Sequence, residues 1–122
     1  MYKLMICGGR DFANKELCFS SIQKFLEEEN LDYSHLIILE GECPTGADSF
    51  AKEFALSHNI LLEKYPADWN KYGKAAGPIR NKQMVKDCDC CLAFWDYKSK
   101  GTKSSIDFCK EFEKKVKIIP YI

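Results

Sequence analysis

Apolar residues along this chain of 122 residues gather in short continuous runs, separated by longer segments with helical spacing. The run Leu36–Leu39 contains no polar residue, which is typical of a strand buried on both faces of a sheet. In the longer segments, apolar residues recur at intervals of three and four. The pattern predicts five β-strands, at Tyr2–Cys7, Leu36–Leu39, Ile60–Tyr65, Cys90–Trp95 and Val116–Ile122.

Four helices are expected between these strands. Asn14 is placed to cap the first helix, and Thr45 the second, with Asp48 three residues later as part of a near capping box. Pro78 suits the first position of the third helix, because its missing N–H needs no partner there. The fourth helix is expected to follow the turn that contains Ser99.

The alternation of strands and helices predicts a single α/β domain over residues 1–122, with a parallel sheet covered by helices on both faces. Glu63 and Lys64 in the third strand and Pro120 in the fifth indicate sheet edges. Right-handed crossovers then favour the strand order 3-2-1-4-5. This order places a crevice between strands one and four, at their carboxyl ends, where ligands bind in such sheets.

The composition is that of an ordinary globular protein, with 46% hydrophobic and 30% charged residues. No apolar run approaches the roughly 20 residues of a membrane span, and the first residues lead directly into a strand. We therefore expect a cytoplasmic protein with no membrane partner. Apolar edges and helix faces are compatible with a homo-oligomer.

The seven cysteines are an odd number, and most of them lie within apolar patterns. Cys7, Cys18, Cys88 and Cys109 are expected to be buried as small hydrophobic residues. Cys88 begins a cysteine-rich run, but the two adjacent cysteines of the following strand should point to opposite faces. We expect no disulfide framework, no metal and no cofactor.

The formal net charge is zero, yet the charges are unevenly distributed. Residues 11–63 carry eleven acids and three bases, whereas residues 64–103 carry nine bases and four acids. The second segment would place a local positive field over the later loops, which suits an anionic ligand. The imbalance is too modest for a general nucleic-acid binder, so nucleic acid is expected not to be the partner.

Two turns between a strand and a helix offer places for a phosphate. Gly8 and Gly9 follow the first strand and would permit positive φ angles and close approach of the backbone to a ligand. Arg10 adds planar donors, although a tight turn with a surface arginine explains the same residues. The turn Ser99–Thr102 begins a helix, where free N–H groups form an anion site or a simple N-cap. Gly101 there permits close approach.

A third candidate segment runs from Pro66 to Gly77 and is expected to be a long loop. Trp69 in this loop would stack on a nucleotide base or pack the loop onto the body of the protein. Arg80 and Asn81 follow at the start of the third helix. A cation in the first turn opposes the helix dipole, which favours an anionic partner for Arg80.

Five motifs follow one another along nearly the whole chain: Gly8-Gly9-Arg10-Asp11-Phe12, Gly46-Ala47-Asp48, Pro66-Ala67-Asp68-Trp69 with Tyr72-Gly73-Lys74, Arg80-Asn81 with Met84, and Ala93-Phe94-Trp95 with Ser99, Gly101-Thr102 and Ile106. Together they resemble the SLOG superfamily, particularly its YspA-like branch. That superfamily also includes the DNA-processing Smf/DprA proteins and the "lonely guy" phosphoribohydrolases.

The resemblance implies a Rossmann-like three-layer fold with a pocket for nucleotides or relatives of ADP-ribose. It places Gly8, Gly9 and Arg10 beside the ligand and Gly101-Thr102 on its phosphate. The ligand-binding set that we predict is Gly8, Gly9, Arg10, Gly46, Asp48, Trp69, Arg80, Asn81, Ser99, Gly101 and Thr102.

The phosphoribohydrolases carry glutamates after their Gly-Gly-x-Gly-Thr turn, whereas residues 99–105 of this chain contain no carboxylate. Cleavage of an N-glycosidic bond usually requires one. Asp11 and Asp68 are the remaining catalytic candidates. The leading hypothesis is therefore binding or sensing of a phosphorylated, nucleotide-derived ligand. A nucleotide N-glycosidic hydrolase is the alternative, and a nucleic-acid-binding module a weaker one.

Overall fold

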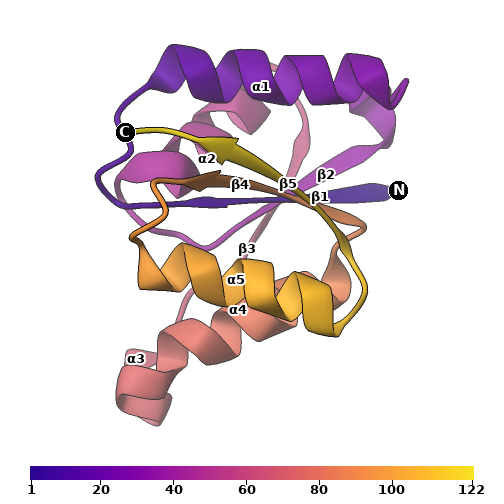
Figure 1. Ribbon diagram of the computed structural model, residues 1–122. Coiled ribbons are helices and arrows are strands. Elements are labelled where there is room, and N and C mark those ends of the chain that lie inside the picture. Colours follow the sequence, from indigo (N-terminus) through magenta and orange to yellow (C-terminus); the bar gives the residue numbers. More distant parts are fainter.

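The five strands form one parallel sheet in the order β3-β2-β1-β4-β5, as the sequence predicts. The computed structural model describes residues 1–122 and is shown in Figure 1. The strands are β1 (Tyr2–Gly8), β2 (Leu36–Glu40), β3 (Leu61–Lys64), β4 (Cys90–Trp95) and β5 (Lys115–Pro120). The chain therefore has a Rossmann-like α/β fold.

The central strand β1 pairs with β2 on one side and β4 on the other, so that Leu4 lies opposite both Ile38 and Cys90. These three residues have no exposed surface. Burial on both faces explains why the central strands are almost entirely apolar. The edge strand β3 is more polar, and its Leu61 is largely exposed.

Two helices cover each face of the sheet (Figure 1). On one face lie α1 (Lys15–Glu28) and α2 (Gly46–Ser57), and on the other α4 (Ala76–Asp87) and α5 (Lys100–Glu111). Each layer has its own hydrophobic core: Phe25 and Phe54 belong to the first, and Met84, Val85 and Cys109 to the second.

The segment before α4 is more ordered than the predicted loop. It contains a short helix, α3 (Trp69–Tyr72), and a 3₁₀ turn, η2 (Gly73–Ala75), and a further 3₁₀ turn, η1 (Tyr33–His35), precedes β2. Asp68 caps α3, because its Oδ1 accepts the N–H of Lys71 at 3.1 Å. Helix α4 begins two residues before Pro78, which its first turn tolerates because N–H groups there have no intrahelical partner.

One of the two predicted caps is confirmed in full, and the other only in its position. Asn14 caps α1 by accepting the N–H of Leu17 at 3.0 Å. Thr45 is the N-cap residue of α2, but its side chain makes no capping hydrogen bond; its hydroxyl donates instead to the carbonyl of Arg10 at 3.0 Å. Asp48 likewise reaches back to the N–H of Cys43. Both side chains therefore join loops rather than close the helix end.

None of the seven cysteines forms a disulfide, and six of them are buried. Cys7, Cys18, Cys88 and Cys109 are among the buried residues, as expected of small hydrophobic side chains. The His, Cys, Asp and Glu side chains form no group of three that could hold a metal ion. No helix has the length and apolar character required to cross a membrane.

We predict that Gly46→Ala destabilises the protein by about 2–4 kcal/mol, because a side chain there is both strained and obstructed. Gly46 has φ of +75°, and a Cβ would lie 2.2 Å from the carbonyl oxygen of Gly9. Urea denaturation would measure the loss. Gly101→Ala is the control: its Cβ would meet nothing within 4 Å, so stability should stay the same or rise by up to about 1 kcal/mol. Equal effects of the two substitutions would contradict this account.

Candidate ligand-binding cleft

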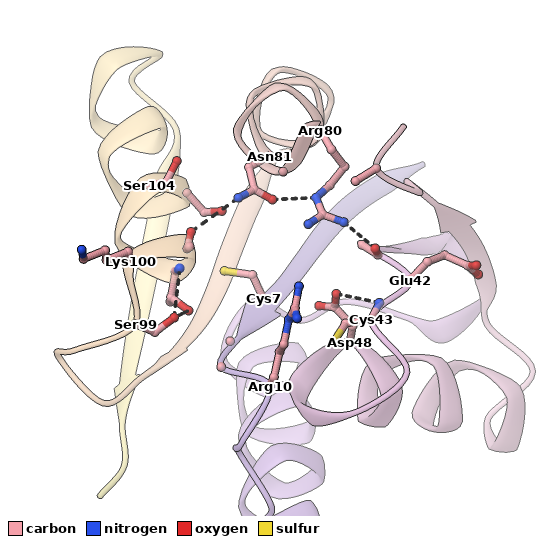
Figure 2. A pocket seen from close by; sticks show the side chains of 18 of the residues that line it. Cys7, Arg10, Glu42, Cys43, Asp48, Arg80, Asn81, Ser99, Lys100 and Ser104 are labelled. Carbon is pink, nitrogen blue, oxygen red and sulfur yellow. Dashed lines mark hydrogen bonds between the residues drawn. The ribbon is translucent and has the colours of Figure 1, made fainter. Parts of the chain in front are cut away.

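A polar cleft of about 1060 Å³ opens at the carboxyl ends of the strands (Figure 2). The loops that follow β1, β2 and β4 line it, together with the first turns of α4 and α5. Only 4 of the 26 lining residues are hydrophobic, so the cleft suits a polar or charged ligand. It lies where the strand order predicted a crevice, and it extends beyond β1 to the end of β2.

Most of the residues predicted from sequence come together in this cleft. Those that line it are Gly8, Gly9, Arg10, Asp11, Asp48, Trp69, Arg80, Asn81, Ser99, Gly101 and Thr102. Gly46 and Asp68 do not line it, because Gly46 packs against the backbone of Gly9 and Asp68 caps α3. Contact of the lining residues with a ligand stays a prediction.

Gly8 and Gly9 are required for close packing rather than for an unusual backbone conformation. Neither has a positive φ, contrary to our expectation. A Cβ on Gly8 would lie 2.7 Å from the Cβ of Ala47, and a Cβ on Gly9 would lie 2.3 Å from the hydroxyl of Tyr121. The two glycines therefore admit α2 and the C-terminal segment next to the end of β1.

Arg10 is a cation with no partner in the protein. Its side chain is exposed, takes part in no ion pair and donates no hydrogen bond. Figure 2 shows its guanidinium standing in the cleft between the start of α5 and Asp48. Its position is held through the backbone, because the carbonyl of Arg10 accepts the Thr45 hydroxyl.

Arg80 makes hydrogen bonds to neutral groups within the protein, and its contact with an anionic ligand stays a prediction. Its Nη1 donates to the carbonyls of Gly41 and Tyr65, and its Nε donates to Oδ1 of Asn81 at 2.8 Å. The guanidinium therefore joins α4 to the ends of β2 and β3. Asn81 extends the link by donating to the carbonyl of Gly101 at 3.5 Å.

Gly41 was missed by sequence reasoning. A Cβ at this position would lie 2.6 Å from Nη1 of Arg80 and 2.9 Å from Oδ2 of Asp48, so only glycine leaves room for both side chains. The available signal was a glycine two residues after a buried apolar run.

The first turn of α5 forms the wall of the cleft beside β4. Ser99 is the N-cap, since its Oγ accepts the N–H of Thr102, and the two hydroxyls lie 3.1 Å apart. Thr102 is buried, so its hydroxyl is used in capping, whereas Gly101 is exposed with open space beside it. Lys98 and Lys100 flank this turn and form no ion pairs. Neither lysine was in the predicted ligand set.

Asp96 fixes the loop between β4 and α5. Its Oδ1 accepts the backbone N–H groups of Lys98 and Ser99 at 2.9 and 2.8 Å. These bonds stabilise the ionised carboxylate and hold the pKa of Asp96 below its usual value. The loop is thus held from within rather than by a ligand.

The two catalytic candidates do not meet at the start of α5. Asp11 accepts a hydrogen bond from the hydroxyl of Tyr121 at 3.0 Å, and Asp68 lies outside the cleft. Burial, together with Asp11, raises the pKa of Tyr121, which keeps its hydroxyl protonated as a donor. Asp11 lines the cleft, and a catalytic role for either carboxylate stays a prediction.

A buried acid lies at the end of β2, next to the loop that lines the cleft. Glu40 is 1% exposed, and its two carboxylate oxygens accept the N–H of Glu42 at 3.0 and 3.2 Å. Burial is the main cause that raises its pKa to about 7, and the nearby Asp48 adds to it. Burial also raises the pKa of Asp48, against the opposing effects of the Cys43 amide and Arg80. Glu40 was not among the residues singled out from the sequence.

We predict that Glu40 makes the free energy of unfolding decrease as pH rises from about 4.5 to about 7. In this window the folded state keeps a proton that the unfolded state, with the usual pKa of 4.5, has released. Urea denaturation of the wild type and of Glu40→Gln across this range would show it. The wild type should lose about 1–3 kcal/mol relative to the variant. If the free energies of unfolding of the two proteins change with pH in the same way, the pKa of Glu40 is not raised in the folded state.

The first 72 residues carry the family assignment. Residues 2–72 match the model of the YspA, cpYpsA-related SLOG family. The chain belongs to this family. The Gene 61 protein of Mycobacterium phage D29 is 30% identical over 109 residues, a stretch that covers 84% of each chain. These findings confirm the resemblance seen in the sequence motifs of the SLOG chain.

Two solved structures share the fold of this SLOG protein. DNA processing protein A (DprA) from Streptococcus pneumoniae superposes with a TM-score of 0.75 and DprA from Helicobacter pylori with 0.71, both at 17% identity. The match covers 100% and 99% of this chain, but only 51% and 66% of the two DprA chains. The structure of the H. pylori protein is described as showing a single-stranded DNA binding mode.

This likeness corrects our expectation that nucleic acid would not be a partner, which rested on the zero net charge. That charge is a sum over an acidic and a basic part of the chain. A net charge of zero does not exclude such a partner, because Arg10, Lys98 and Lys100 line the cleft and form no ion pairs.

Proposed function

We propose that the cleft binds a phosphorylated, nucleotide-derived ligand, with a phosphate between the first turn of α5 and Arg10. The observation that carries this proposal is the guanidinium of Arg10, which forms no ion pair or hydrogen bond and stands in the cleft that the first turn of α5 also lines. The N–H groups of a first helical turn have no intrahelical partners, and the helix dipole favours an anion there. Lys98 and Lys100 add positive charge at the rim.

Trp69 supports a nucleotide rather than a bare phosphate. Its side chain is 52% exposed, although it lines the cleft beside Gly77. An aromatic ring at this place could stack on a base, which contributes about 1–3 kcal/mol. A ligand that reaches from α5 to Trp69 therefore has a phosphate at one end and a planar ring at the other.

A short segment of single-stranded nucleic acid is the second candidate ligand. It is favoured by the shared fold with DprA, whose H. pylori member is described as binding single-stranded DNA. The cleft of about 1060 Å³ is also at the upper limit of the roughly 300–1,000 Å³ that is usual for small-molecule sites.

We predict that the protein binds AMP or ADP-ribose with a dissociation constant on the order of micromolar, which isothermal titration calorimetry would measure. This constant corresponds to a binding free energy of about 8 kcal/mol. Arg10→Gln should weaken binding by about tenfold or more, because a charge-assisted hydrogen bond is lost. Lys24→Gln is the matched control, since Lys24 is exposed on α1 and does not line the cleft. Equal affinities of the two variants, or no binding of any nucleotide or oligonucleotide, would show that the proposed function is wrong.

The same titrations with oligo(dT) at several salt concentrations separate the two candidates. If Arg10, Lys98 and Lys100 each neutralise one phosphate, log K should fall against log salt with a slope of about −2. The slope should become about 0.7 less steep in Arg10→Gln. Tight binding of mononucleotides without oligonucleotide binding would assign the cleft to the smaller ligand.

A further inference from the structure

The two walls of the cleft differ in charge, although the α5 side also contains Asp96, which is engaged by the N–H groups of its own loop. Lys98 and Lys100 flank the wall formed by α5, whereas Glu42 and Asp48 belong to the wall formed by the loop after β2 and the first turn of α2. Figure 2 shows Arg10 between the two walls. A phosphate is attracted to the first wall and repelled from the second. The part of a ligand that faces the second wall should therefore donate hydrogen bonds.

Asp48 is the acceptor on that second wall. Glu42 is exposed and pairs with Lys64 at 3.5 Å, and Figure 2 shows it pointing away from the cleft. Asp48 takes part in no ion pair; its Oδ2 accepts the N–H of Cys43 at 3.2 Å, and the charges of Arg80 and Arg10 favour its ionised form. Its Oδ1 accepts no hydrogen bond, and Asp48 lines the cleft.

The position of Asp48 is fixed before any ligand arrives. It lies in the first turn of α2, and its other oxygen is held by the loop after β2. Gly41 leaves the space for it, since a Cβ there would lie 2.9 Å from Oδ2. A fixed acceptor with one unused oxygen can discriminate between ligands that do and do not supply a donor.

In a nucleotide the sugar lies between the phosphate and the base. A nucleotide with its phosphate beside Arg10 and its base at Trp69 would have its sugar within the same cleft, which Asp48 also lines. We propose that Oδ1 of Asp48 accepts a hydrogen bond from a ribose hydroxyl, so that the cleft selects ribonucleotides over 2′-deoxyribonucleotides. This inference rests on the proposed function, because it requires a nucleotide in the cleft. A hydroxyl supplies the missing donor without bringing a second charge to the partly buried carboxylate.

The test compares AMP, 2′-deoxy-AMP and IMP by isothermal titration calorimetry on three proteins: the wild type, Asp48→Asn and Asp89→Asn. The wild type should bind AMP at least about tenfold more tightly than 2′-deoxy-AMP. In Asp48→Asn this ratio should fall to near one. Asparagine can still accept the Cys43 N–H, and thermal unfolding would confirm that the variant is folded.

Asp89→Asn is the matched control, because Asp89 is an exposed acid directly before β4. It lies at the amino ends of the strands, whereas the cleft opens at their carboxyl ends. This variant should keep the wild-type ratio. Equal affinity of the wild type for AMP and 2′-deoxy-AMP would overturn the inference while leaving the proposed function intact. An equal loss of both ligands in Asp48→Asn would also overturn it, because the carboxylate would then act by holding Arg10.

If the wild type binds IMP more weakly than 2′-deoxy-AMP, Asp48 accepts a hydrogen bond from the amino group of the base. The inferred hydrogen bond from a ribose hydroxyl is then wrong. Binding of oligo(dT) without any binding of AMP would reject it as well. If the wild type binds neither mononucleotides nor oligonucleotides, the proposed function fails, and the inference fails with it.

Discussion

The cleft depends on how closely the loop after β1 approaches the first turn of α2. Gly46 has φ of +75°, and a Cβ there would lie 2.2 Å from the carbonyl of Gly9. The hydroxyl of Thr45 adds a hydrogen bond to the carbonyl of Arg10. These contacts fasten the loop that carries Arg10 to the helix that carries Asp48. The contacts between this loop and the first turn of α2 therefore fix the positions of both Arg10 and Asp48.

The two arginines of the cleft show that the residue type alone does not identify a ligand contact. Arg80 is engaged by the carbonyls of Gly41 and Tyr65 and by Asn81, so it acts as a tie between α4 and the ends of two strands. Arg10 makes no such bonds and stands in the cleft. The zero net charge is equally uninformative, because it sums 18 bases and 18 acids over the whole chain and does not tell which of them form ion pairs.

The strand order was predictable because its signals are local. Apolar runs mark the buried strands, Pro120 marks an edge, and the handedness of crossovers restricts the topology. The helix α3 was missed because four residues are too few to show a helical period, although Asp68 was visible as a cap. Glu40 was missed because nothing in a sequence distinguishes a buried acid at a strand end from a solvated one.

By itself, the sequence determined the fold, the family and the edge of the sheet at which the cleft opens. Each follows from patterns within short segments and from the geometry of parallel strands. Only the tertiary structure decided which polar groups remain unpartnered. Arg80 meets Gly41 across 39 residues and Asp11 meets Tyr121 across 110, while Arg10 and one oxygen of Asp48 have no such partner. Such pairings depend on where distant segments meet in space, which no local pattern records.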